Sequence, residues 1–144
     1  MKSVNHSLKV LLSDTYTLYL KTQNYHWHVK GPYFKPLHEL FEEQYTELAM
    51  AIDSIAERLR ILGENAPASF AEFEEVRTLK DGNSKLAATD MLKEIHTDHL
   101  SLIAALHKAF IQATESNDEG SVALLSERIA VHEKMAWMLA SSFG

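Results

Sequence analysis

Residues 26–43 read HWHVKGPYFKPLHELFEE, a stretch that combines a helix break with several possible metal ligands. Gly31-Pro32 is expected to end one helix, because proline cannot continue it and glycine favours the turn. Pro36 follows at a position suited to the first turn of the next helix, where its missing N–H costs nothing. The stretch therefore predicts a tight turn between two helices, with histidines and glutamates on both sides of it.

Helical periodicity extends on both sides of this turn and recurs further along the chain. Apolar residues stand three or four positions apart, the spacing of an amphipathic helix, in four segments. The segments run from Leu8 to Leu18, from Phe41 to Leu62, from Met91 to Phe110 and from Val122 to Leu139. Glycines are expected to mark two boundaries, with Gly63 capping the second segment and Gly120 separating the last two.

The connection between the second and third segments is long and contains a helix signal of its own. It spans Gly63 to about Ser84 and includes Ser69-Phe-Ala-Glu72, the pattern of a capping box. One short helix is therefore expected inside it. Because a long crossover lets the helices on either side run parallel, the pattern predicts an all-α, ferritin-like four-helix bundle with a short extra helix in the crossover between helices 2 and 3.

Composition limits the class of protein. The chain has 144 residues, 46% of them apolar, and we expect a single ferritin-like domain over residues 1–144. It has no cysteine, which excludes disulfides and thiolate metal sites and favours a reducing, cytoplasmic location. No apolar run is long enough to span a membrane. The formal net charge of −6 disfavours binding to nucleic-acid phosphates and favours cations as partners.

Four possible metal ligands fall on one face of the second helix. At about 100° per residue, His38, Glu42, Asp53 and Glu57 lie within an arc of about 100°. The first pair and the second pair are nevertheless separated by about 22 Å along the helix, which exceeds one coordination sphere. Antiparallel pairing with the same helix of a twofold-related copy, about a point near Glu47, would set each first pair opposite a second pair and close two identical sites.

His26 is expected to join these ligands, since the tight turn folds the end of the first helix back to the height of His38. Imidazole and carboxylate ligands together suit iron, manganese or zinc, whereas magnesium and calcium prefer oxygen alone. The alternative is that these side chains are only solvated surface, with the carboxylates paired to Arg58 or Arg60. Asp53 borders the apolar stripe, where an unpaired carboxylate would be costly, and is therefore expected to have a partner.

The remaining histidines and the aromatic residues near the turn carry weaker signals. Six histidines are expected to be exposed polar residues: His6, His28, His96, His99, His107 and His132. The pair His96 and His99 could also bind a metal together. Three aromatic residues, Tyr25, Trp27 and Tyr45, could donate electrons to a nearby metal site, but core packing is their expected role.

Several motifs around the proposed ligands share the spacing of a known family. They are His26-Trp27-x-Val-x-Gly31, Leu37-His38 with Glu42, Ile52-Asp53-x-Ile-Ala-Glu57-Arg58 and Leu62-Gly63. On these motifs the sequence resembles the Dps family of mini-ferritins, the DNA-binding proteins from starved cells and their relatives. The resemblance implies a homo-oligomeric shell of twelve four-helix subunits around stored ferric mineral.

The resemblance also implies a ferroxidase that oxidises two Fe(II) ions at each twofold interface, preferably with hydrogen peroxide rather than dioxygen. Carried over by position, the iron ligands and near-ligands are His26, His38 and Glu42 of one subunit with Asp53 and Glu57 of its twofold mate. Zinc and manganese are the expected competitors of iron. The family tends to admit iron through acidic pores near the start of the last helix, a region that here contains Glu115, Asp118 and Glu119.

The chain departs from the DNA-binding members of this family, which commonly carry tails rich in Lys and Arg. Only Lys2 and Lys9 lie near its start, and it ends at Ser-Ser-Phe-Gly144. Direct DNA binding is therefore not expected, which disfavours the alternative of a nucleoid-condensing protein. A third alternative, a surface antigen or adhesin built on the same cage, would leave no motif.

Overall fold

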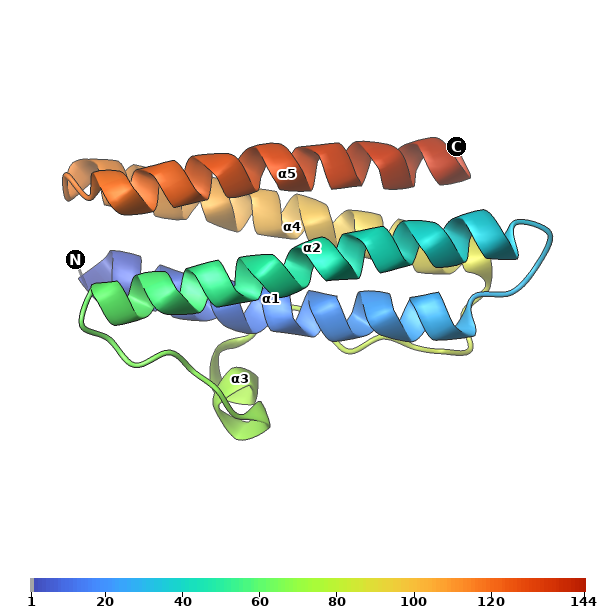
Figure 1. Ribbon diagram of the computed structural model, residues 1–144, viewed down its shortest axis with the longest axis horizontal. Coiled ribbons are helices and arrows are strands. Elements are labelled where there is room, and N and C mark those ends of the chain that lie inside the picture. The colour runs from blue at the N-terminus through green and yellow to red at the C-terminus, as the bar shows by residue number, and fades with distance from the viewer. Residues whose placement is uncertain (1) are drawn as a thin grey trace.

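Five helices make up the part of the chain that the structure, a computed structural model, describes: residues 2–144. They are α1 (Lys2–His28), α2 (Phe34–Ile61), α3 (Phe70–Val76), α4 (Ala88–Glu115) and α5 (Glu119–Phe143). α1 and α2 form one antiparallel pair, α4 and α5 form the other, and the pairs pack into a four-helix bundle (Figure 1). α2 and α4 run in the same direction (Figure 1), so the predicted all-α bundle with its long crossover is confirmed.

The core of the bundle is formed by the predicted apolar stripes. Its largest fully buried side chains include Leu8, Leu18, Tyr25, Phe41, Leu48, Ile95, Leu102 and Leu106. These residues come from α1, α2 and α4 and recur four, seven or ten positions apart, so each helix turns one apolar face inward. Burial of these faces, rather than intrinsic helix propensity, supplies most of the stability of such helices.

The crossover runs along the outside of α1, from one end of the bundle to the other, with α3 partway along it (Figure 1). Ser69 caps α3 by accepting from the Glu72 N–H, which confirms the predicted capping box. The buried Asp14 carboxylate on α1 accepts hydrogen bonds from the Thr78 N–H at 2.6 Å and the Leu79 N–H at 3.0 Å. These bonds tie the segment after α3 to the bundle.

Gly63 ends α2, as the sequence predicts. Its φ of +83° lies in the left-handed region, where glycine has no steric penalty. The Gly63 N–H bonds the Arg60 carbonyl at 3.1 Å, and the Glu64 N–H bonds the Leu59 carbonyl at 2.9 Å. These two bonds form a Schellman motif and satisfy carbonyls that the end of the helix would otherwise leave unpaired.

Gly63→Ala is expected to lower the free energy of unfolding by about 1 kcal/mol, because an L side chain is strained at this φ. Nothing lies within 4 Å of a Cβ placed at this position, so the effect isolates the backbone. Thermal unfolding measures the loss. Gly63→Asn is the control, since asparagine tolerates the left-handed region and should recover part of the stability. An alanine variant as stable as the parent would show that this conformation carries no strain.

The link between α4 and α5 differs from the prediction. Gly120, which was expected to separate the helices, lies in the first turn of α5, and the left-handed residue of the link is Asn117, with φ 57°. Asparagine can adopt this conformation, so no glycine is needed there. Gly120 instead allows the Arg58 side chain to approach the helix closely, because a Cβ at this position would lie 2.5 Å from a guanidinium nitrogen of Arg58.

Candidate metal centre

The α1–α2 turn holds His26 and His38 face to face. Their imidazole rings stack with centroids 3.8 Å apart and planes 12° apart. Nδ1 of each ring lies 2.7 Å from the backbone carbonyl oxygen of the other histidine. A carbonyl can only accept, so each Nδ1 carries a proton and each Nε2 of the neutral ring keeps its lone pair. The reciprocal pair therefore fixes the tautomer that metal-binding histidines use.

Glu42 completes a set of three converging ligand atoms. It lies one turn after His38 on α2, and its Oε1 is 3.7 Å from His26 Nε2. One ligand atom from each of the three residues lies within 4.8 Å of the other two. Two nitrogens and one carboxylate oxygen suit iron, manganese or zinc. The structure thus brings together three of the five predicted ligands within one chain.

Two aromatic rings flank this cluster. Phe34 stacks on His38 with centroids 5.0 Å apart, and Tyr45 meets His26 edge-on at 5.2 Å. His26 is buried, His38 is half-buried and Glu42 is exposed, so the cluster opens toward solvent on the Glu42 side. Phe34 was not predicted to take part, although its spacing of four residues from His38 on one helix was an available signal.

The geometry of the turn places these ligands. Gly31 adopts a φ of +116°, and its carbonyl accepts from the Phe34 N–H at 3.1 Å. Pro36 lies in the first turn of α2, as predicted, where no intrahelical N–H bond is lost. The last turn of α1 and the second turn of α2 are therefore held at the same height.

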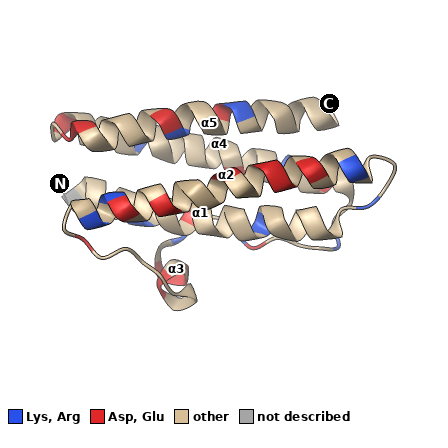
Figure 2. Cartoon of the chain, in the orientation of Figure 1, with Lys and Arg blue, Asp and Glu red and all other residues tan. Residues whose placement is uncertain are grey.

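Asp53 and Glu57 lie on α2 away from this cluster. Both are exposed, and Figure 2 shows Asp and Glu recurring along this helix. Neither carboxylate forms an ion pair with any side chain of residues 3–144, so the partner expected for Asp53 is not found within the described chain. The alternative pairing with arginines is not formed either, since Arg58 bonds Asp118 at 2.6 Å and Arg60 bonds a backbone carbonyl at 3.0 Å.

Comparison with known proteins shows the family. Residues 5–144 match the ferritin-like domain. DNA protection during starvation protein 2 of Bacillus anthracis is 38% identical over 138 residues, which cover 96% of this chain and 94% of that protein. A Dps protein from Bacillus brevis has a crystal structure that matches with a TM-score of 0.96 at 34% identity, covering 99% of this chain and 96% of that one. The chain belongs to the Dps family.

A further Dps protein, from Vibrio cholerae O1, matches with a TM-score of 0.95 at 29% identity and covers 99% of this chain and 90% of its own. It is described as a member of a broad superfamily of ferritin-like diiron-carboxylate proteins. Both structural matches span almost the whole Dps chain, including the crossover and α3.

Two histidines of this Dps chain are buried, contrary to the prediction that they are exposed. His99 is 0% and His132 is 1% exposed, because both face the contact between α4 and α5. Their Nδ1 atoms lie 2.9 Å apart, so each ring satisfies part of the other's hydrogen-bonding capacity. Burial lowers the pKa of both rings. Outside the group of His26, His38 and Glu42, His96 is half-buried. Three further histidines are exposed as predicted: His6, His28 and His107.

The aromatic residues near the turn are only partly core. Tyr25 is fully buried, as predicted, and burial and a hydrogen bond to Glu94 raise the pKa of its hydroxyl. Tyr45 is half-buried. Trp27 is 59% exposed, so its predicted core role is wrong for the single chain: it follows His26 on the outer side of α1.

Asp118 is not free to line an iron-entry pore. It is buried, caps α5 through the Ser121 N–H and binds Arg58. Burial alone would raise the pKa of Asp118. The hydrogen bonds from Ser121 and Arg58 outweigh this effect and hold the pKa of Asp118 below its usual range. Glu115 and Glu119 are exposed, so of the three acidic residues in this region only these two are available to line a pore.

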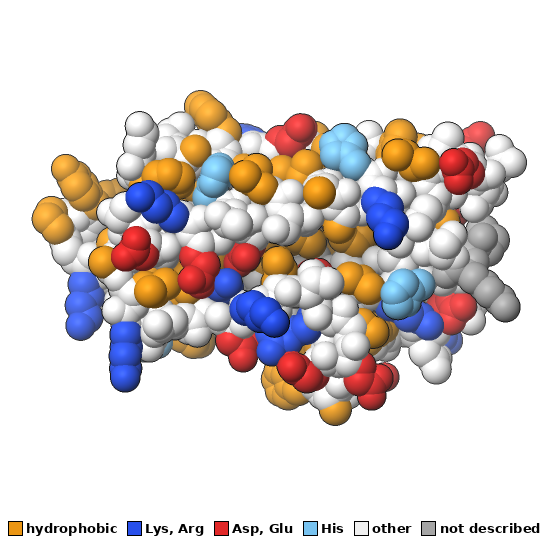
Figure 3. Space-filling model, turned by 180° about the vertical axis from the view of Figure 1, so that it is seen from behind, with side chains coloured by type: hydrophobic (Ala, Val, Ile, Leu, Met, Phe, Trp, Pro, Cys, Tyr) orange, Lys and Arg blue, Asp and Glu red, His pale blue; other side chains and the backbone are white. Residues whose placement is uncertain are grey.

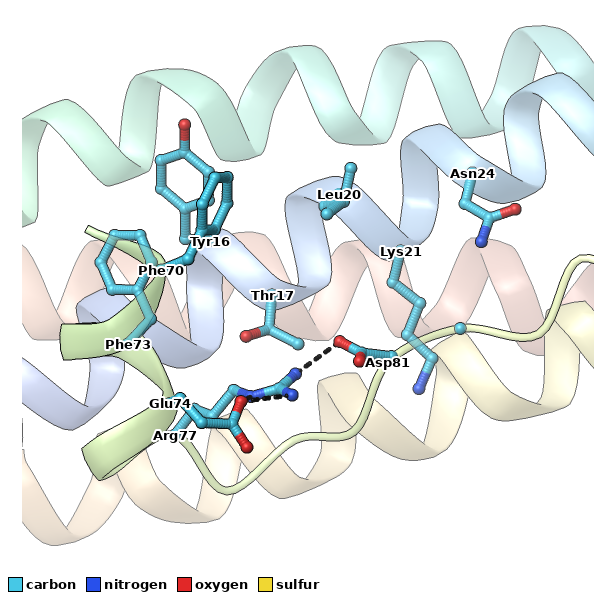
Figure 4. A pocket seen from close by; sticks show the side chains of 11 residues that line it. Tyr16, Thr17, Leu20, Lys21, Asn24, Phe70, Phe73, Glu74, Arg77 and Asp81 are labelled. Carbon is cyan, nitrogen blue, oxygen red and sulfur yellow. Dashed lines mark hydrogen bonds and ion pairs between the residues drawn. The ribbon is translucent and has the colours of Figure 1, made fainter. Parts of the chain in front are cut away.

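A separate cavity of about 340 Å³ lies between α1, α3 and the crossover (Figure 4). Tyr16 and Phe73 stack at one end of it, with centroids 4.9 Å apart. Its charged groups are already paired: Arg77 contacts both Glu74 and Asp81 at 2.7 Å. This cavity therefore does not offer the combination of histidine and free carboxylate that the turn offers.

The surface of the Dps chain carries both signs of charge. On the face seen from behind, Lys and Arg side chains are interspersed with Asp and Glu (Figure 3). A phosphate backbone is bound by clustered cations, whereas the cations on this face have carboxylates beside them (Figure 3). Among residues 2–144 there is no helix with the length and apolar character needed to cross a membrane.

Proposed function

We propose that this Dps chain is an iron-storage and detoxification mini-ferritin, a ferroxidase whose dinuclear sites are shared across twofold subunit interfaces. The observation that carries the proposal is the reciprocal pair of His26 and His38, which keeps both Nε2 lone pairs available beside Glu42. The diiron-carboxylate description of the Vibrio cholerae relative supports iron as the metal. Assembly of twelve copies would enclose the hollow in which ferric mineral is stored.

Three ligands are too few to hold two iron ions, so the turn supplies half of a site. Asp53 and Glu57 supply the other half from a second copy, because they are exposed and lie on the same face of α2. Thr46 and Ala49 lie between the two halves and are both exposed and small. Small side chains allow two helices to approach closely, which favours antiparallel α2–α2 contact about a twofold axis.

Iron is the substrate of this site. Two Fe(II) ions each give one electron to the same hydrogen peroxide molecule and become Fe(III). The O–O bond of the peroxide breaks, and its two oxygen atoms take up two protons and leave as two water molecules. Anionic carboxylates favour the more highly charged Fe(III) and so promote electron loss. Because both electrons reach one peroxide, no hydroxyl radical is released.

Dioxygen is the alternative oxidant, and zinc and manganese compete for the same nitrogen and oxygen ligands. We place the protein in the cytoplasm, as a single domain over residues 1–144, because a chain without cysteine suits a reducing compartment. Direct DNA binding is not part of the proposal, since the net charge is −6.

The test is the absorbance time course of ferric product after hydrogen peroxide is added to anaerobic protein loaded with Fe(II). Replacing Asp53→Asn together with Glu57→Gln removes both charges but keeps the side-chain shapes, and is expected to slow oxidation about tenfold or more. Glu127→Gln with Glu133→Gln is the matched control, because these carboxylates are equally exposed but lie on α5. Equal rates in the parent and the first variant would exclude the proposed site.

A further inference from the structure

Four buried polar residues, one from each bundle helix, lie in the core. They are Thr22 on α1, Gln44 on α2, His99 on α4 and His132 on α5. None of the four is more than 3% exposed. Buried polar groups are retained only where hydrogen bonds satisfy them, so their partners need to be identified.

Contacts between α2, α4 and α5 place three of these residues at one height. His99 Nδ1 and His132 Nδ1 are 2.9 Å apart. Gln44 Nε2 donates to the backbone carbonyl of Met135 at 3.3 Å, about one turn from His132 on α5. The Gln44 side chain therefore reaches across the core to the helix that carries His132.

Thr22 joins these three residues from α1, and the four residues together form a polar layer across the bundle. Its chain neighbour Lys21 forms an ion pair at 2.8 Å with Asp98, the chain neighbour of His99. Because α1 and α4 run in opposite directions, one step along each helix from this ion pair separates Thr22 and His99 by only about 3 Å in height. Both Thr22 and His99 are fully buried.

The hydrogen-bond directions in this layer follow from Arg128, which is always protonated. It contacts the Glu47 carboxylate at 2.9 Å and donates from Nη2 to His132 Nε2 at 2.9 Å. His132 Nε2 is then the acceptor of its neutral ring, and Nδ1 carries the proton that is donated to His99 Nδ1. His99 in turn carries its proton on Nε2. The chain of donors thus ends on an N–H in the centre of the bundle.

Among Thr22, Gln44, His99 and His132, three polar atoms have no hydrogen-bond partner within the described residues. They are His99 Nε2, Gln44 Oε1 and Thr22 Oγ1, and all three are inaccessible to solvent. The first is a donor, the second is an acceptor and the third can be either. Leaving any of them unpaired would cost a large fraction of the stability of one domain.

We propose that one internal water molecule binds in this layer, accepting from His99 Nε2–H and donating to Gln44 Oε1 and Thr22 Oγ1. Three hydrogen bonds to otherwise unpaired groups are what buried waters typically make. The water completes a hydrogen-bonded layer that joins all four helices and fixes the tautomer of both histidines.

A metal ion is disfavoured at the same place. Both ring nitrogens of His132 are already used, one by Arg128 and the other by His99. The guanidinium also places a positive charge beside the ring, which repels a second cation. A neutral guest with both donors and acceptors fits the three free atoms, and an ion does not.

The test combines crystallography of the assembled protein with one pair of variants. At a resolution that shows ordered water, a peak is expected within about 3 Å of the three atoms. Thr22→Val removes one partner and is expected to lower the Tm by about 2–4 °C. Thr17→Val is the matched control and should change the Tm less, because the Thr17 hydroxyl bonds only the Ser13 carbonyl of its own helix.

Three results would overturn the proposal. The first is a dry layer in which the Gln44 amide bonds His99 directly. The second is a metal ion at the position of the water. The third is a Thr22→Val variant that is no less stable than Thr17→Val. The measurements do not depend on iron oxidation, so they stand apart from the test of the proposed function.

Discussion

Two variants, each expected to lose most of the proposed ferroxidase activity, are expected to regain part of it when they assemble together. The first is His38→Asn, in which the amide can still donate to the His26 carbonyl but the metal-binding nitrogen is lost. The second is Asp53→Asn with Glu57→Gln. In a twofold pair made of one chain of each kind, one site loses both sets of ligands and the other site is intact.

Random pairing at equal amounts makes half of the pairs mixed, so about a quarter of all sites should be intact. The measurement is the initial rate of Fe(II) oxidation by hydrogen peroxide after the two variants are dissociated and reassembled together. A mixture of separately assembled variants is the control and should keep the low rate of the single variants. If reassembly restores no activity although mixed shells form, the five ligands do not act across a twofold interface.

The free energy of unfolding is expected to fall as the pH is lowered from 6.5 to 5. Burial lowers the pKa of His99 to about 3 and that of His132 well below its ordinary value, and the Arg128 guanidinium acts in the same direction. The unfolded chain takes up these protons near pH 6.5, whereas the folded chain does not, so acid favours unfolding. The two rings together should cost about 3 kcal/mol over this range.

Urea or thermal unfolding at several pH values measures this loss. Replacing both His99 and His132 by phenylalanine is expected to flatten the pH dependence of unfolding over this range, whatever the change in absolute stability. His107→Gln is the control, because His107 is exposed on α4, and it should leave the dependence unchanged. A parent protein that is equally stable at pH 6.5 and pH 5 would show that the rings are not held neutral in the core.

Local rules were sufficient for the helices, the caps and half of the candidate site. The left-handed glycine after α2, the capping box before α3 and the tight turn before α2 each depend on a few adjacent residues. The convergence of His26, His38 and Glu42 also follows from such rules, because a short turn and the helical repeat determine which residues meet. Gly120 was misjudged because its role is a contact with the distant Arg58.

The sequence by itself determined a bundle of amphipathic helices with a long crossover and a set of candidate ligands split along one helix, since apolar periodicity, turn residues and helical spacing are properties of short segments. Only the tertiary structure decided that His99 and His132 are buried and that Trp27 is exposed. The physical reason is that burial depends on how each helix is rotated against its neighbours. A polar residue on a core face resembles a surface residue until its partner on another helix is known.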